Sequence, residues 1–135
     1  MFYIVVLVSA CNKPLGLQNG RLRNSKITAS SEWNHKHAAW LGRLGRPARS
    51  GYAGAWCSKH NNHYQWIKFD FSRPMRITQV ATQGRQDYDQ WVTRYTISSS
   101  VDGTHWAMYR DKSQDKVTWQ LLICRIAQLV EPKRK

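Results

Sequence analysis

Residues 65–71, with the sequence QWIKFDF, alternate strictly between core-type apolar side chains and other residues. The alternation places Ile67, Phe69 and Phe71 on one face of an extended segment and the intervening residues on the other. Side chains of a β-strand repeat with a period of two, whereas those of a helix repeat every 3.6 residues. This segment therefore predicts a strand with one buried face and excludes a helix at this point of the chain.

Other segments carry related strand and turn signals. Residues 91–97 (WVTRYTI) alternate in the same way, and residues 76–82 (RITQVAT) are rich in β-branched side chains, which favour strands. The dipeptide Asp102-Gly103 is typical of a hairpin turn, because both residues tolerate a positive φ. Residues 32–54, rich in Gly, Arg, His and Asn, predict long surface loops.

The length of 135 residues leaves room for one domain, and seven Trp, six Tyr and three Phe exclude a disordered chain. Short strands joined by long loops favour an antiparallel β-sandwich. Trp40, Trp56 and Trp66 are expected in the core. The residues expected to be buried between the two sheets are Ile67, Phe69, Ile77, Val80, Tyr95 and Ile97.

The positive charge is uneven along the chain, whose formal net charge is +13. Between Lys13 and Lys59 there are nine basic residues and a single acid, Glu32. Such a stretch attracts polyanions, which include phosphatidylserine surfaces, sulfated glycans and nucleic acids. The alternative is a basic, solvated face with no single ligand. With only eight carboxylates, no Ser/His/Asp arrangement and no Gly-rich phosphate loop, we expect a binding module and not an enzyme.

The three cysteines, Cys11, Cys57 and Cys124, are an odd number, so a secreted chain would leave one thiol unpaired or lack a partner for it. Residues 1–10 (MFYIVVLVSA) are interpreted as a possible signal-peptide remnant ending in small residues. A lipoprotein signal ending at Cys11, a buried first strand and an incomplete gene start are the alternatives. Residues 117–130 form an apolar segment that fits a helix or a strand but is too short to span a bilayer.

Metal binding is not expected. The pattern Cys57-x-x-His60-x-x-His63 contains zinc-type ligands, but it is a weak signal because a zinc site needs four convergent groups. Asp87 and Asp89 are an equally weak calcium signal. We predict no metal and no cofactor.

Several motifs together resemble the discoidin domain family, also called the coagulation factor V/VIII type C domain. They are CNKPLGLQNGRLRNSKITASSEW from Cys11, Gly54-Ala55-Trp56-Cys57, then QWIKFDF followed by ITQVATQGR, and finally QWVTRYTISSSVDGTHW. The resemblance covers residues 11–112 and implies an all-β, galactose-binding-like jelly-roll sandwich. Residues 113–135 share none of its motifs, so we interpret them as a non-family tail and expect incomplete C-terminal strands. A Cys11–Cys124 disulfide is conceivable but is not the expectation.

The resemblance also implies a ligand site in loops at one end of the barrel, here residues 32–37, 42–52 and 85–89. An exposed Trp33 would insert into a membrane interface or stack on a sugar, although it could instead pack within its loop. Basic side chains of the same loops would bind phosphate or sulfate. The expected anion contacts are Lys36, Arg43, Arg46, Arg49 and Arg85.

The predicted function is that of a secreted, extracellular adhesion module. It would recognise an anionic phospholipid membrane, a glycan or a protein such as collagen, as part of a larger multidomain protein or as a fragment of one. The alternative is nonspecific binding of polyanions such as nucleic acid through the basic face, which the charge alone would allow; no specific nucleic-acid partner is expected.

Overall fold

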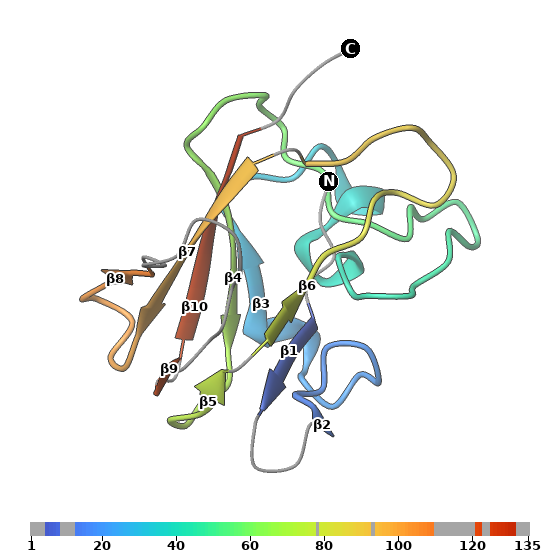
Figure 1. The fold of residues 1–135 in the computed structure, drawn as a ribbon. Coiled ribbons are helices and arrows are strands. Elements are labelled where there is room, and N and C mark those ends of the chain that lie inside the picture. The colour runs from blue at the N-terminus through green and yellow to red at the C-terminus, as the bar shows by residue number, and fades with distance from the viewer. Residues whose placement is uncertain are drawn as a thin grey trace.

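The computed structural model describes residues 5–8, 13–77, 79–92, 94–109, 121–122 and 125–131 as antiparallel strands, short 3-10 turns and long loops (Figure 1). The strands are β1 (Val5–Val8), β2 (Lys13–Pro14), β3 (Ile27–Ala29), β4 (Gln65–Asp70), β5 (Arg76–Ile77), β6 (Gln79–Ala81), β7 (Arg94–Ser100), β8 (Ala107–Met108), β9 (Leu121–Leu122) and β10 (Arg125–Glu131). The 3-10 turns are η1 (Asn24–Lys26), η2 (His35–His37) and η3 (Ala39–Leu41). No helix among the described residues is long and apolar enough to cross a membrane.

One layer of the sandwich is a five-stranded sheet in the order β3-β4-β10-β7-β8. Its central strand is β10, which pairs along its length with β4 on one side and with β7 on the other. The expectation that residues 113–135 do not complete the barrel is therefore wrong for β10. Without β10, the facing edges of β4 and β7 would leave backbone N–H and C=O groups unpaired. This apolar segment contains no turn residues, so it can pair with both strands along its length. Cys11 and Cys124 lie outside the described residues, so their predicted relationship stays untested.

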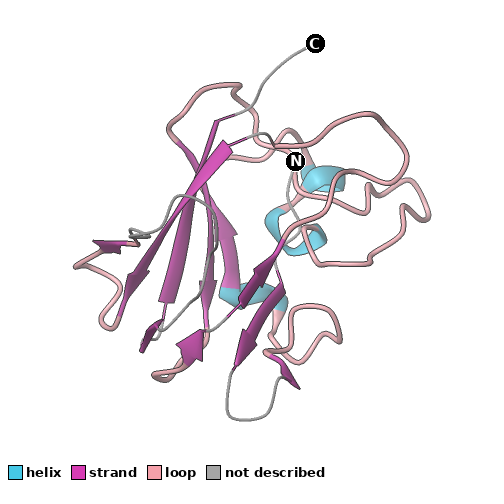
Figure 2. Ribbon diagram, viewed as in Figure 1, coloured by secondary structure: helices cyan, strands magenta, loops and turns pink. Residues whose placement is uncertain are grey.

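The other layer contains the three-stranded sheet β2-β1-β6 and the strand pair β5-β9 (Figure 2). β1 is the central strand of the three-stranded sheet and pairs with β6 through Val5, Val6 and Leu7. Residues 5–8 of the segment interpreted as a signal-peptide remnant thus form a strand, in line with the alternative of a first strand.

The core lies between the two layers and follows the alternation of β4. Ile67 and Phe69 are 0% and 1% exposed, and Ile77 and Ile97 are also buried, as predicted. Val80 is only half-buried, and the prediction is wrong for Tyr95, which is 38% exposed near the start of β7. The remaining members of the core cluster are Leu17, Leu22, Ile27, Ala39, Trp56 and Phe71. Of the three expected core tryptophans, only Trp56 is fully buried, and Trp40 and Trp66 are half-buried.

The predicted hairpin joins β7 to β8, but its loop is longer than the two residues that Asp102-Gly103 suggests. The pairing of Ser99 with Ala107 closes the hairpin, and Gly103 has a φ of 81°. The Asp102 carboxylate accepts hydrogen bonds from the backbone N–H groups of Thr104 and His105. Asp102 therefore stabilises a loop that is longer than the two-residue Asp-Gly hairpin turn.

Candidate binding surface at the loop end

Two long connections gather at one end of the sandwich: residues 30–64, between β3 and β4, and residues 82–92, which follow β6 (Figure 1). We call these two segments the loop end. The first connection contains η2 and η3 and is stabilised by hydrogen bonds between its own polar groups. The Glu32 carboxylate accepts the backbone N–H of Ala39 at the start of η3, at 2.6 Å.

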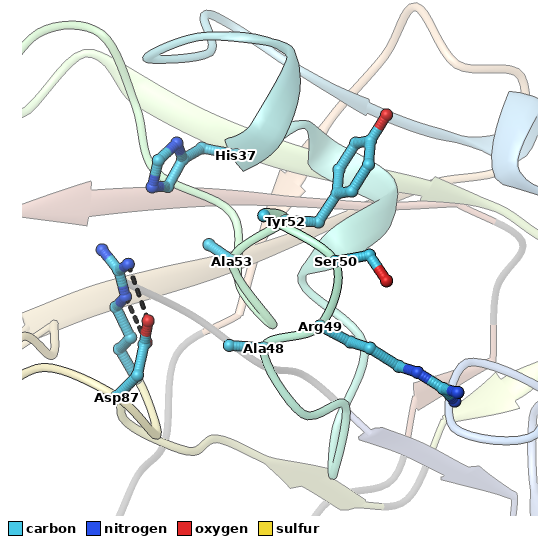
Figure 3. A pocket seen from close by; sticks show the side chains of 9 residues that line it. His37, Ala48, Arg49, Ser50, Tyr52, Ala53 and Asp87 are labelled. Carbon is cyan, nitrogen blue, oxygen red and sulfur yellow. Dashed lines mark hydrogen bonds and ion pairs between the residues drawn. The ribbon is translucent and has the colours of Figure 1, made fainter.

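The loop end contains an open hollow of about 300 Å³ (Figure 3). All three of the segments expected to form a ligand site contribute to it, although they are far apart in the sequence. The side chains that line it belong to His37, Ala48, Arg49, Ser50, Tyr52, Ala53, Arg85 and Asp87, with Gly51 between them. The structure thus brings together the loops that the family resemblance implies.

A tight turn at Arg49–Tyr52 forms one wall of the hollow. The backbone N–H of each of these two residues donates to the carbonyl of the other at 3.0 Å, and Ser50 and Gly51 between them have φ values of 54° and 77°. Two consecutive positive φ angles are the mark of a type I′ turn. The Lys36 Nζ atom lies 3.7 Å from the place where a Cβ atom on Gly51 would stand. Two exposed cations, Lys36 and Arg49, therefore flank this turn, and the Arg49 side chain points away from Asp87 (Figure 3).

Arg85 and Asp87 form the opposite wall as an ion pair, and Figure 3 marks its contacts. The Arg85 guanidinium donates through Nη2 to Asp87 at 3.0 Å and through Nη1 to Gln90 at 3.2 Å, and it stacks 4.7 Å from the centre of the Tyr88 ring. The hydrogen bond from Arg85 holds the pKa of Asp87 below its usual range. Arg85 lies at the predicted site, but much of its charge is offset by Asp87, and its side chain fixes the loop.

His37 and Cys57 lie beside this ion pair. Burial and the nearby Arg85 lower the pKa of His37, so its imidazole is neutral at pH 7. Burial raises the pKa of the Cys57 thiol to about 11, so this thiol is protonated and adds no charge to the hollow. Within the described part of the chain, no three side chains of His, Cys, Asp or Glu come together as metal ligands.

Arg46 stands apart from the hollow, over an aromatic ring. Its guanidinium carbon lies 4.8 Å from the centre of the Trp40 ring, a cation–π contact. Trp40 packs against Tyr52, whose ring lies edge-on to His35 with the two ring centres 6.1 Å apart. Arg46 is half-buried and keeps its charge at the surface of the loop end.

Arg43 corrects a prediction, because it is not a surface cation. It is 5% exposed, and its guanidinium donates to the carbonyl oxygens of Leu17 at 2.8 Å and Leu22 at 2.6 Å and to the Asn24 side chain at 2.7 Å. The side chain points inward and joins its loop to partners that lie 19 to 26 residues away in the sequence. An anion at the surface cannot reach it in this structure.

Exposed aromatic side chains occur in both segments of the loop end. Trp33 is 62% exposed, as the sequence predicted, and its backbone N–H donates a hydrogen bond to the Cys57 carbonyl at 2.8 Å. Tyr88, which lies in the predicted loop 85–89, is 65% exposed, and Trp91, which the sequence analysis missed as a site residue, is 51% exposed. Trp91 was assigned to a strand, but β7 begins only at Arg94. The acidic and polar run QDYDQ immediately before Trp91 is the signal that could have extended the predicted loop 85–89 to Trp91.

The described residues therefore form an antiparallel β-sandwich with an aromatic, basic loop end and a small hollow. The chain belongs to the F5/8 type C domain family, whose profile matches residues 26–123. The match continues beyond residue 112, where the sequence motifs end.

Similar proteins include the human EGF-like repeat and discoidin I-like domain-containing protein 3, which is 37% identical over 114 residues. That alignment covers 81% of this chain and 24% of the relative. Rat lactadherin is 35% identical, with 79% of this chain and 26% of the relative covered. Human coagulation factor V is 37% identical, with 82% and 5% covered. The chain thus spans about a quarter or less of the length of these relatives.

The fold is similar to a solved structure of discoidin II from Dictyostelium discoideum. The TM-score is 0.64, at 20% sequence identity, and the alignment covers 78% of this chain and 48% of the other. The jelly-roll sandwich predicted from the sequence is therefore confirmed.

Proposed function

We propose that this domain is an extracellular recognition module that attaches through its loop end to membrane surfaces containing anionic phospholipid. Trp33 supplies an apolar anchor, and Lys36, Arg46 and Arg49 supply contacts to phosphate groups. Arg85 contributes mainly by holding its loop against Asp87. Arg43 is left out of the proposed site because its guanidinium is engaged inside the protein.

One observation carries this proposal: exposed aromatic rings and exposed cations occur together at the same end of the sandwich. Trp33 and Trp91 are more than half exposed, and Lys36 and Arg49 are exposed in the same loop end. Indole rings favour the interface between lipid headgroups and hydrocarbon, and cations near the surface favour anionic lipid. Catalysis would need an arrangement of acids, bases or nucleophiles, and the proposed role uses none.

The alternative function is nonspecific attachment to polyanions through the basic face, for which the net charge of +13 is the supporting observation. The two functions differ in how binding responds to salt. Attraction between exposed charges is screened over about 10 Å at 0.1 M salt, whereas burial of an aromatic ring is much less sensitive. Equal binding to DNA and to vesicles, with loss of both at high salt, would favour the alternative.

Trp33→Ala is expected to weaken binding to vesicles of phosphatidylserine and phosphatidylcholine roughly ten- to hundredfold at every salt concentration. Removal of a buried aromatic anchor costs about 1.5–3 kcal/mol, and each 1.4 kcal/mol corresponds to a factor of ten. Vesicle co-sedimentation measures the effect. Val101→Ala is the matched control, because Val101 is 59% exposed but lies in the β7–β8 loop at the other end. A folded Trp33→Ala protein that binds like wild type removes Trp33 from the site.

The double variant Lys36→Ala/Arg49→Ala is expected to flatten the salt dependence of vesicle binding. Each exposed cation near an anionic surface contributes about 1 kcal/mol at low salt, so the double variant loses roughly thirtyfold there and much less at high salt. Co-sedimentation at several salt concentrations provides the slope. Arg21→Ala/Arg23→Ala is the charge-matched control, since both arginines are exposed but lie outside the loop end. If both double variants flatten the slope equally, attachment is not specific to the loop end.

A further inference from the structure

We propose that Asn19 deamidates spontaneously and that the fold confines this reaction to the exposed tip of the loop between β2 and η1. The inference goes beyond the proposed function and is independent of it, because this loop lies beside β1 and β2 and is not part of the loop end (Figure 1). Asn19-Gly20 is the only Asn-Gly pair in the sequence, and every other asparagine precedes a residue with a side chain. The attacking group is the backbone nitrogen of the following residue, which a glycine leaves unhindered because it has no Cβ.

The loop has a fixed stem and an exposed tip. Leu17 and Leu22 in the stem are 1% and 8% exposed, and the Leu22 N–H donates to the Gly16 carbonyl at 3.0 Å. The Arg43 guanidinium donates to the carbonyl oxygens of both leucines. Residues 18–21, which connect the two leucines, are all exposed. A chemical change in this tip therefore leaves the buried contacts of the stem in place.

The geometry of the tip favours attack on the Asn19 side chain. Gly20 has a φ of 76°, and no heavy atom of the described residues lies within 4 Å of the position that a Cβ on it would occupy. The Asn19 side-chain oxygen accepts the backbone N–H of Arg21 at 3.2 Å. This hydrogen bond closes a ring of atoms that includes the Gly20 nitrogen, so it turns the Asn19 amide back toward the nitrogen that attacks it. The same N–H stabilises the negative charge that develops on the side-chain oxygen during the attack.

The reaction has two steps, and water is its only co-reactant. In the first step the Gly20 nitrogen loses its proton and bonds to the Asn19 Cγ atom, the Cγ–Nδ2 bond breaks, and the amide nitrogen takes up a proton and leaves as ammonia. The product is a cyclic succinimide. In the second step water opens this ring. Cleavage between the Gly20 nitrogen and the main-chain carbonyl of Asn19 gives isoaspartate, and cleavage between that nitrogen and Cγ gives aspartate. Either product has a carboxylate in place of the neutral amide and lowers the formal net charge of +13 by one.

Asp102-Gly103 is the comparison within the same chain, because an aspartate before glycine can also form a succinimide, with loss of water. Here the fold engages both reacting groups. The Gly103 N–H, which would be the nucleophile, donates to the Ser100 hydroxyl at 2.7 Å. The Asp102 carboxylate accepts the backbone N–H groups of Thr104 and His105, and the hydrogen bond with the His105 side chain lowers its pKa. An ionised carboxylate is a poor electrophile, so we expect no isoaspartate at this position.

Incubation of the folded chain at pH 6.5 and at pH 8.5, followed by peptide mapping, tests the inference. The peptide that contains Asn19 is expected to gain the mass difference between an amide and an acid, and to accept a labelled methyl group from isoaspartyl methyltransferase. The product should form faster at pH 8.5, because the attacking nitrogen must lose its proton. Ion-exchange chromatography of the intact protein should show a more acidic form that grows in parallel. The peptide that contains Asp102 is expected to stay unlabelled.

Variants assign the acidic form to this residue. Asn19→Gln keeps the amide but would have to form a larger ring, and it is expected to lose both the acidic form and the methyl label. Asn61→Gln is the matched control, since Asn61 is also exposed but precedes another asparagine, and it should behave like wild type. Gly20→Ala places a methyl group beside the attacking nitrogen and is expected to slow the reaction. Asn19→Asp carries the new charge from the start and marks where the acidic form elutes.

The full chain unfolded in urea is the reference that separates the effect of the fold from that of the sequence. In urea both Asn19 and Asp102 are expected to give isoaspartate, whereas in the folded protein only Asn19 does. If Asn19 reacts in urea but stays intact in the folded protein, the tip protects this residue and the inference is wrong. It is also wrong if folded protein is labelled equally at Asp102, or if Asn19→Gln forms the acidic species as fast as wild type.

Discussion

Ala127→Pro should destabilise the domain by about 2–4 kcal/mol, because it interrupts the central strand of the larger sheet. The backbone of Ala127 pairs with Lys68 on β4 and with Ser98 on β7. Proline has no backbone N–H, so one ladder hydrogen bond is lost and a buried carbonyl remains unsatisfied, at a cost of about 1–3 kcal/mol. The ring also points toward a neighbouring strand that lies only about 4.8 Å away, which adds steric strain.

Urea unfolding followed by tryptophan fluorescence measures this loss as a lower midpoint. Met108→Pro is the matched control on the edge strand β8. The neighbouring Tyr109 N–H donates to the Ile97 carbonyl, and because donor directions alternate along a strand, the Met108 N–H points away from β7. A smaller effect is expected there. Equal midpoints for wild type and Ala127→Pro would show that β10 is not part of the cooperative fold.

Arg43→Ala should lower the free energy of unfolding by about 3 kcal/mol or more. The substitution leaves the buried carbonyl groups of Leu17 and Leu22 without their charged donor, and each such loss costs about 1–3 kcal/mol. Arg43→Lys is expected to restore little, since an ammonium group lacks the planar fork that reaches both carbonyls. Thermal and urea unfolding of the purified domain provide the measurement.

Arg46→Ala is the comparison for Arg43, because the two residues lie three positions apart and have the same charge. Arg46 makes a surface cation–π contact with Trp40, worth about 0.5–1 kcal/mol. Its loss should weaken vesicle binding while the domain stays folded. If Arg43→Ala instead unfolds like wild type and loses only its affinity for vesicles, then Arg43 is an anion contact, as the sequence alone suggested.

Some features of this protein depend on local pattern and could be predicted from the sequence. The burial of Ile67 and Phe69 follows from the two-residue period of β4, which is a property of any extended chain. Residues 32–54 form a loop because they are rich in residues that favour turns. Trp33 is exposed because it lies in this loop. The family motifs then predicted which loops share one end of the sandwich, and the hollow combines residues of all three.

Other features were decided only by contacts between distant segments. Residues 117–130 show no period that separates a helix from a strand, and β10 forms because the edges of β4 and β7 both offer unpaired backbone groups. Arg43 and Arg49 have the same chemistry in the same loop, yet one is buried against Leu17 and Leu22 and the other is exposed. The difference arises because those two carbonyls come within hydrogen-bond distance of Arg43 only after the chain has folded. The sequence therefore shows that a charged side chain is present, and the tertiary structure determines whether the protein's own backbone engages it or whether it stays exposed to a ligand.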